Sequence, residues 1–476
     1  MAGRQVLRRD FLKTAGLGTV GLALSCLLPG CESGQERPSI LFITADDMNW
    51  DSLGVTGCKV PDITPNIDRL ASEGLRFTHA HVNIAVCQPC RESILTGRYP
   101  HNNGALGFDP IRADVPTLNE QLHRAGYMNG ILGKTGHYKP PVKFCWDFKI
   151  HRKELLNGRD PDLYSRFTKA FLSRAKVAQK PFFLHVNSHD PHRPFEKARK
   201  KSKYPILRAY RPREVAVPGF LPDIPKVRQE VAWYFNSVHR CDETVGKVLR
   251  ALEESGLAGN TLVLFMSDHG MAFPFAKTNC YLNSTRTPLI VRWPGRCTPG
   301  TVDREHLVSG VDIMPTLLEA AGLNRTKGLE GRSFCPLLLG RKYEGCGTVF
   351  TVFNRTAKRR DYPMRCIMTR KHAYIYNPWS DGKTVFRNES QAGLTMKAMM
   401  KAAAQDRCIA ERVKLFLYRV PEEFYDLEKD PDALHNLVKK SGCRERVRRM
   451  RLKLLEKMKS TSDPLLGRFK EFCSGH

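Results

Sequence analysis

Short apolar runs, each followed by a small polar cluster, recur along the first two thirds of the chain. The runs are continuous rather than alternating, which is typical of strands that are buried on both faces. They lie at 40–44, followed by Asp46 and Asp47; at 129–133, followed by Lys134 and His137; at 182–187, followed by His189 and His192; and at 261–266, followed by Asp268 and His269.

Helical patterns lie between these runs, for example at 68–73 and 243–255. Strands that alternate with helices predict an α/β fold, in which a mostly parallel sheet carries helices on both faces. Folds of this kind bind ligands at the carboxyl ends of the strands. The four polar clusters are therefore expected to form one site.

The hydrophobic pattern changes after about residue 345. Alternating strands at 348–353, 364–369 and 372–376 indicate an antiparallel sheet, and 446–459 has the spacing of a helix with one apolar face. The basic residues of that helix are expected to face solvent. The 476-residue chain is long enough for two domains, so we predict a catalytic domain at 37–345 and a smaller α+β domain at 346–476.

Residues 1–36 have the form of an export signal. Arg8 and Arg9 precede an apolar run at 15–28, which matches a twin-arginine signal and is short for a spanning helix. We expect a bacterial protein that uses the twin-arginine export machinery and reaches the periplasm. Residues 28–31 resemble a lipobox, so a lipid anchor on Cys31 at the cell envelope is an alternative, as is an uncleaved membrane-anchoring helix.

The formal net charge of +28 predicts an affinity for polyanions. No nucleic-acid-binding motif is present, so we expect no nucleic-acid partner, and sulfated polysaccharide fits both the charge and an exported protein. The basic run 197–203 is expected to line the mouth of the site or to form a solvated loop. The fifteen cysteines form no regular disulfide framework and no zinc-finger spacing.

The most specific motif is CQPCRESILTGR at 87–98. Cys87 and Cys90 form a CxxC pair, which alone would allow a redox or metal-binding interpretation. However, Pro89 and Arg91 serve no redox purpose, and no second CxxC completes a zinc site.

On this CxPxR motif with its trailing TGR, the chain resembles the type I sulfatases of the alkaline phosphatase superfamily. Further segments that carry the resemblance are 64–70, 311–317 and 423–427, and it extends over about 38–437. Within the family, 189–193 and 267–279 are similar to the heparan N-sulfatases. The resemblance implies an alkaline-phosphatase-like α/β fold.

The resemblance also implies that a maturation enzyme oxidises Cys87 to formylglycine, whose hydrated aldehyde is the nucleophile. One divalent cation would be held by Asp46, Asp47, Asp268, His269 and the modified Cys87. Calcium is our choice because carboxylate oxygens suit it. Magnesium or another divalent ion stays open, since His269 stands where the family commonly has asparagine.

The remaining roles follow from the same resemblance. Arg91 and Lys134 would hold the diol and the sulfate, and Lys277 would be a second sulfate contact. His189 would be the general acid, and His137 would act on the diol. His192 and Arg193 would contact the substrate. His137 departs from the family pattern, because it follows Lys134 by three positions rather than two. We expect Gly136 to absorb the extra residue in a turn.

The expected function is hydrolysis of sulfate from a sulfated carbohydrate, with the N-sulfoglucosamine of heparin or heparan as the leading substrate. Three alternatives stay open: a carbohydrate O-sulfatase, a phosphoester or phosphonate hydrolase on the same fold, and a polyanion-binding protein without catalysis.

Overall fold

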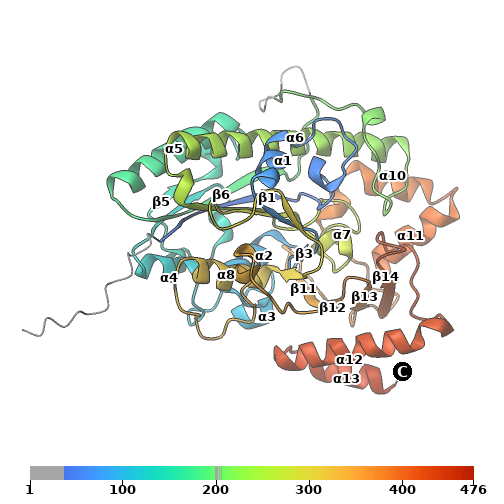
Figure 1. Ribbon diagram of the computed structural model, residues 1–476. Coiled ribbons are helices and arrows are strands. Elements are labelled where there is room, and N and C mark those ends of the chain that lie inside the picture. The colour runs from blue at the N-terminus through green and yellow to red at the C-terminus, as the bar shows by residue number, and fades with distance from the viewer. Residues whose placement is uncertain (1–36, 199–201, 203, 205, 476) are drawn as a thin grey trace, which may run out of the picture. The chain divides into compact units, whose positions relative to one another are not determined.

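The computed structural model describes residues 37–198, 202, 204 and 206–475. Its centre is an eight-stranded sheet whose four longest apolar strands lie side by side (Figure 1). The strand order is β5 (Phe148–Ile150), β4 (Met128–Leu132), β6 (Phe182–Pro191), β1 (Ser39–Asp46), β7 (Thr261–Ser267), β8 (Leu289–Arg292), β2 (Leu75–Phe77) and β9 (Thr301–Asp303).

The pairs β5–β4, β4–β6, β6–β1, β1–β7 and β2–β9 are parallel, whereas β7–β8 and β8–β2 are antiparallel. Strands β1 and β7 are buried along almost their whole length, which explains why their sequences are continuous apolar runs. The predicted mostly parallel sheet is thus confirmed. A separate two-stranded sheet pairs β3 (Ala80–His81) with β10 (Val308–Ser309).

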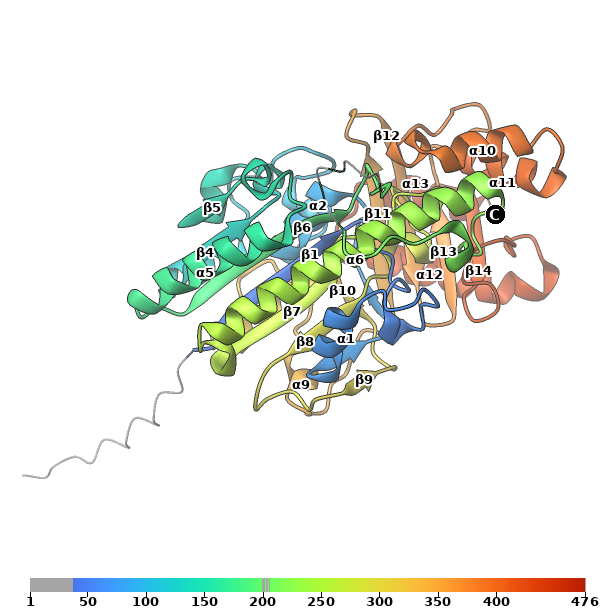
Figure 2. The same ribbon diagram turned by 90° about the horizontal axis from the view of Figure 1, so that it is seen from above.

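Helices cover both faces of this sheet, as predicted (Figures 1 and 2). One face carries α1 (Pro65–Ser72), α5 (Pro161–Val177) and α6 (Pro225–Glu254), and the other carries α2 (Cys87–Thr96), α4 (Leu118–Arg124) and α8 (Ile313–Ala320). Helix α6 begins well before the predicted 243–255, since its buried face already starts at Val227. The short helices α3 (Pro100–Asn103), α7 (Leu282–Thr285) and α9 (Cys335–Leu338) connect these elements.

The C-terminal part forms a second, antiparallel sheet, again as predicted. Its order is β11 (Val349–Arg355), β12 (Asp361–Met368), β13 (His372–Tyr376) and β14 (Glu422–Asp426), with α10 (Leu394–Ala402), α11 (Arg407–Tyr418), α12 (Arg444–Ser460) and α13 (Leu466–Ser474) around it. The buried residues of α12 are Val447, Met450, Leu454 and Met458, so its apolar face packs inward and its basic residues face out. Both sheets belong to one compact unit that spans 37–476.

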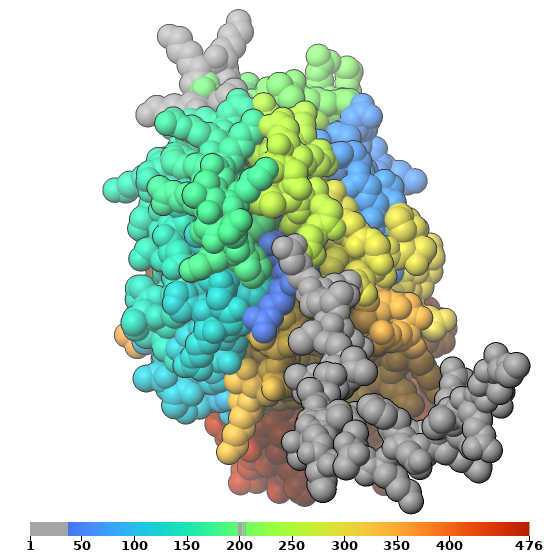
Figure 3. Space-filling view, turned by 60° about the vertical axis from the view of Figure 1, so that its left-hand side comes forward, coloured from blue at the N-terminus to red at the C-terminus, as the bar shows by residue number. Residues whose placement is uncertain are grey.

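The carboxyl ends of β1, β6 and β7 meet at one edge of the large sheet, where the predicted polar clusters lie. The opposite, amino edge is where the described chain begins, in dark blue in Figure 3, with Arg37 exposed. No helix in the described part of the chain is long and apolar enough to cross a membrane. The predicted export signal and the lipobox with Cys31 lie outside the described residues, as do 199–201 and 203 of the basic run.

Candidate active site

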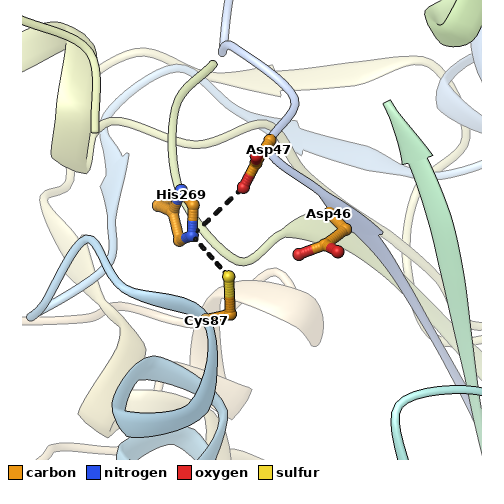
Figure 4. A group of neighbouring side chains, drawn as sticks. All are labelled: Asp46, Asp47, Cys87 and His269. Atoms are coloured by element: carbon orange, nitrogen blue, oxygen red, sulfur yellow. Dashed lines mark hydrogen bonds and ion pairs between the residues drawn. The ribbon is translucent and has the colours of Figure 1, made fainter. Parts of the chain in front are cut away.

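Four side chains from three segments converge at the carboxyl edge of the sheet (Figure 4). Asp46 ends β1 and Asp47 follows it, Cys87 begins α2, and His269 follows β7. One ligand atom from each lies within 4.8 Å of the others, and all four side chains are buried. The Nε2 atom of His269 is 3.4 Å from both Cys87 Sγ and Asp47 Oδ1.

Local backbone geometry fixes this cluster. Asp47 adopts a left-handed conformation with φ of 69°, which turns the chain sharply at the end of β1. Gly270 follows His269 at a place with no room for a side chain, because a Cβ atom there would lie 1.9 Å from the Asn283 carbonyl oxygen. Gly97 of the TGR sequence ends α2 with φ of 60°, a conformation that favours glycine.

Arg91 contacts both Asp46 and Asp268 and so holds these two carboxylates near each other. Its Nε and Nη2 atoms donate to Asp268 Oδ2 at 3.1 and 2.8 Å, and Nη2 lies 3.5 Å from Asp46 Oδ1. Its Nη1 donates to Thr44 Oγ1 at 2.8 Å and to Asn187. The side chain is 1% exposed. These four side chains hold the guanidinium, so Arg91 organises the carboxylates, while its expected contact with the diol and the sulfate stays a prediction.

Lys134 and His189 flank Asp46 on its other side. The ammonium of Lys134 forms a buried ion pair with Asp46 Oδ2, and His189 Nδ1 lies 3.5 Å from the same oxygen. Although burial opposes ionisation, Lys134 and the other cationic groups hold the pKa of Asp46 well below its usual range. Burial, assisted by Lys134, lowers the pKa of His189 well below its usual value.

Lys277 reaches the cluster from the loop after β7. Its Nζ donates to both oxygens of Asp47, at 2.7 and 2.9 Å, and forms an ion pair with Glu389. Burial alone would lower the pKa of Lys277, but Asp47, followed by the other nearby acidic groups, raises it well above its usual value. An ammonium has three N–H donors. The two Asp47 oxygens and the Glu389 carboxylate therefore engage all three donors of Lys277.

Glu389 was missing from the predicted site. It begins a short turn between β13 and α10, where no motif or apolar pattern marks it. Its carboxylate, Cys87 Sγ and a ring nitrogen of His192 lie within 4.8 Å of one another. Thr44 and Asn187, which hold Arg91, were also missed; their only signal is that they are polar residues inside otherwise apolar strands.

His137 lies in a 3₁₀ turn at Thr135–His137, where its backbone N–H donates to the Lys134 carbonyl at 2.9 Å. The left-handed residue of this turn is Lys134, with φ of 51°, rather than Gly136. The imidazole packs edge to face against Phe108, with ring centroids 5.9 Å apart. Burial, then Lys134 and Arg91, lowers the pKa of His137 well below its usual value.

A buried ionic network positions the segment after β6. Arg240 donates to both oxygens of Asp190 at 2.7 and 3.0 Å, and Arg159 donates to Asp190 and to the His192 carbonyl, at 2.9 and 2.8 Å. His192 stacks on His189 with ring centroids 4.9 Å apart. This network fixes both histidines beside Asp46.

Arg193 points away from this stack. Its guanidinium donates to Glu230 at 2.5 Å and to the Ala272 carbonyl, and it lies over the rings of Phe195 and Phe273. These contacts link α6 to the loop after β7, which gives Arg193 a structural role in addition to the predicted substrate contact.

The site fits a hard divalent cation and an oxidised residue 87. Both carboxylate oxygens of Asp46 are buried; Oδ2 contacts the Lys134 ammonium, and Oδ1 has no hydrogen-bond partner, its cationic neighbour Arg91 lying 3.5 Å away. Two carboxylates and an imidazole are ligands that divalent ions accept. Burial raises the pKa of the Cys87 thiol well above its usual value, against the influence of Lys277. A thiol in that state is a poor nucleophile.

Comparisons with known proteins agree with this geometry. The sulfatase family model matches residues 38–323, and a second model, for a family of unknown function, matches 228–441. The chain is 28% identical to human N-sulphoglucosamine sulphohydrolase, over 93% of this chain and 95% of that protein.

Two solved structures share the fold. One is a complex of a protein with its substrate D-glucosamine-2-N,6-O-disulfate, at a TM-score of 0.66 and 18% identity, covering 90% of this chain and 99% of that one. The other is the phosphonate monoester hydrolase of Agrobacterium radiobacter, at a TM-score of 0.66 and 20% identity, covering 89% and 96%. The family match extends over more than half of the chain and includes the CxPxR motif. The chain therefore belongs to the sulfatase family and is a hydrolase of sulfate esters or sulfamates.

Proposed function

We propose that this sulfatase removes the N-sulfate from glucosamine residues of heparin-type or heparan-type saccharides. The observation that carries the proposal is the human N-sulphoglucosamine sulphohydrolase relative, which aligns over nearly the full length of both chains. The net charge of +28 supports a polyanionic substrate.

We further propose that Cys87 acts as formylglycine and that Asp46, Asp47, Asp268 and His269 hold one calcium ion with it. Asp268 is not one of the four clustered residues but borders them, since its Oδ1 accepts from the backbone N–H of Asp47 at 3.1 Å and lies 3.7 Å from His269 Nε2. When bound, the cation supplies Lewis-acid polarisation of the sulfate. The hydrated aldehyde supplies the attacking oxygen.

The chain's own residues then align and neutralise the reactants. Arg91 keeps Asp46 and Asp268 in place beside residue 87, and Lys134 adds positive charge next to Asp46. His189 has its Nδ1 beside Asp46, whose charge favours the protonated imidazole against the effect of burial, and Nε2 would then be the nitrogen that passes a proton to the departing amine. His137 lies one turn beyond Lys134 and would assist release of sulfate from residue 87.

Lys277 and Glu389 would shape the pocket around the sulfate. An incoming sulfate must displace Glu389 from Lys277 to gain that ammonium as a donor. The displaced carboxylate is an acceptor that suits the hydroxyl groups of a sugar ring. His192, which lies beside Glu389, is the second proposed sugar contact.

A carbohydrate O-sulfatase and a phosphonate ester hydrolase are the alternatives. An O-sulfatase would use the same site residues; its substrate differs only in that an oxygen atom, rather than a nitrogen atom, leaves the sulfur. The phosphonate hydrolase gains support from the fold shared with the Agrobacterium radiobacter enzyme. Export through the twin-arginine machinery, with or without a lipid on Cys31, remains a proposal that rests on the sequence of residues 1–36.

Measuring the released anions tests the proposal. Enzyme produced together with a formylglycine-generating enzyme is incubated with N-sulfoglucosamine, glucosamine 6-O-sulfate and a phosphonate monoester, and ion chromatography quantifies free sulfate and the phosphonate product. We expect sulfate from N-sulfoglucosamine and none from a Cys87→Ala control. Sulfate from the O-sulfated sugar alone would overturn the N-sulfatase assignment, and turnover of the phosphonate alone would favour the second alternative.

A further inference from the structure

A cationic hollow lies outside the catalytic cluster and shares no residue with it. Its volume is about 380 Å³. Its lining includes three cationic side chains, two histidines and one acid: Arg286, Arg370, Lys371, His79, His81 and Glu428. They come from β3 and the residues just before it, from the residue that follows α7, from the turn between β12 and β13, and from the segment after β14.

Arg286 forms the floor of this hollow, which we call the Arg286 pocket. Its guanidinium lies 3.7 Å from the centroid of the Trp50 ring, and its Nε donates to the Thr78 carbonyl at 2.8 Å. No carboxylate of the described residues lies within ion-pair distance of it. Burial lowers the pKa of Arg286 to about 10; the nearby Asp51 opposes this shift and Arg76 adds to it. Asp51 acts on Arg286 electrostatically but makes no ion-pair contact with it. A guanidinium held flat with no carboxylate in direct contact still has donors to offer an anion.

The opposite wall adds positive charge. Arg370 and Lys371 are exposed on the β12–β13 turn. Lys371 pairs with Glu428 at 3.3 Å, whereas Arg370 contacts only a backbone carbonyl, that of Arg304, at 3.4 Å. The same field acts on His79, since burial, then Arg286 and Arg370, lowers its pKa to about 4. One acid therefore faces several cations across the hollow.

The Arg286 pocket lies at the same edge of the sheet as the catalytic cluster. Strand β8 is antiparallel to β7, and β2 is antiparallel to β8, so β2 runs in the direction of β1 and β7. His79 follows the carboxyl end of β2, just as Asp46 and Asp47 stand at the carboxyl end of β1. Trp50 also follows Asp47 closely in the chain, and its indole N–H donates to Asn283 of α7 at 3.1 Å.

We propose that the Arg286 pocket binds a sulfate group of a sulfated polysaccharide, distinct from the sulfate that is hydrolysed. The forked donors of Arg286 match two sulfate oxygens, and Arg370 and Lys371 neutralise the remaining charge. The pocket would thus hold the polymer across the carboxyl edge of the sheet. The choice of a saccharide rests on the proposed function, whereas the preference for an anion rests on the pocket alone.

The test compares a charge reversal at the pocket with a matched reversal elsewhere. Arg370→Glu combined with Lys371→Glu alters two exposed side chains, so folding is expected to be retained. The control is Lys176→Glu combined with Lys180→Glu, which makes the same change in net charge at the end of α5. This control lies next to the start of β6, at the amino edge of the sheet.

Two measurements are made on the full-length enzyme and both variants. Calorimetry gives the affinity for a heparin-derived hexasaccharide and, separately, for inorganic sulfate. Steady-state kinetics give kcat/KM on N-sulfoglucosamine monosaccharide and on the hexasaccharide. We expect the pocket variant to bind the hexasaccharide about tenfold more weakly than the control, with a matching rise in KM and unchanged kinetics on the monosaccharide.

Each outcome decides the proposal. Equal hexasaccharide affinity in the pocket variant and the control would overturn it. A loss of inorganic sulfate binding without a loss of hexasaccharide binding would assign the pocket to free oxyanions and overturn the saccharide assignment. If wild-type enzyme releases no sulfate from any substrate, the proposed function fails, but the calorimetric comparison still decides whether the pocket binds the polymer.

Discussion

The contact between Glu389 and Lys277 predicts that Glu389→Gln strengthens the binding of inorganic sulfate. In the structure the carboxylate of Glu389 neutralises an ammonium that is fully buried and also bound to Asp47. The amide of glutamine keeps the size of the side chain and removes its charge. The charge of the Lys277 ammonium is then less neutralised, so it attracts an incoming anion more strongly.

The magnitude follows from the position of Glu389. Its carboxylate lies within 4.8 Å of Cys87 Sγ, where the sulfate must approach residue 87. Two like unit charges at about that distance repel by about 3 kcal/mol at an effective dielectric constant of about 20. The Glu389 side chain is 45% exposed, so solvent screening reduces this to about 1–2 kcal/mol, which is about a five-fold to thirty-fold change in affinity.

Calorimetric titration of sodium sulfate into the ligand-free proteins measures this effect without relying on turnover. The matched control is Glu445→Gln, an exposed acid at the start of α12. Sulfate affinity should rise in Glu389→Gln and stay unchanged in Glu445→Gln. Unchanged or weaker binding of sulfate to Glu389→Gln would refute the reasoning that Glu389 competes with sulfate for Lys277.

Three further predictions address the carboxylates and the cation. Arg91→Lys keeps the charge but cannot bond Asp268, Thr44 and Asn187 together, so we expect a loss of about 3–5 kcal/mol in the free energy of unfolding, measured by urea denaturation; an unchanged denaturation midpoint would contradict the organising role of Arg91. Chelation with EGTA should lower both the melting temperature and sulfate release, and calcium should restore them better than magnesium; indifference to EGTA would argue against a resident cation. Burial raises the pKa of Asp242 to about 6, so the folded state binds a proton that the unfolded state has released, and stability due to this group should fall by about 3 kcal/mol as pH rises from about 4 to 6; Asp242→Asn should remove that slope, and an identical pH profile for both proteins would contradict it.

The strands that carry the site were predictable because each buried apolar run is followed directly by polar residues that can bind a ligand. The run before Asp46 and the run before Asp268 had to be buried strands, and polar residues directly after such strands meet at one edge of a parallel sheet. The CxPxR motif placed Cys87 among them. The strand positions needed only local patterns and one topological rule, whereas the role of Cys87 came from the resemblance of its motif to the type I sulfatases.

Contacts made over long distances in the chain were not predictable in this way. Glu389 reaches Lys277 from a turn between β13 and α10, and nothing in the neighbouring residues marks it. The engagement of Arg91 with Thr44 and Asn187 depends on the registers of β1 and β6, which a single sequence does not give. The early start of α6 was missed because its first turns lie outside the segment with the clearest helical spacing.

The central claim is that residue 87, as formylglycine, performs the hydrolysis. The most direct test is to prepare enzyme samples with different extents of maturation, quantify the aldehyde at residue 87 by peptide mass spectrometry, and measure sulfate release from N-sulfoglucosamine for each sample. The account predicts a rate proportional to the fraction of residue 87 in the aldehyde form, with no activity in fully unconverted enzyme. Sulfate release that does not depend on this fraction would contradict it.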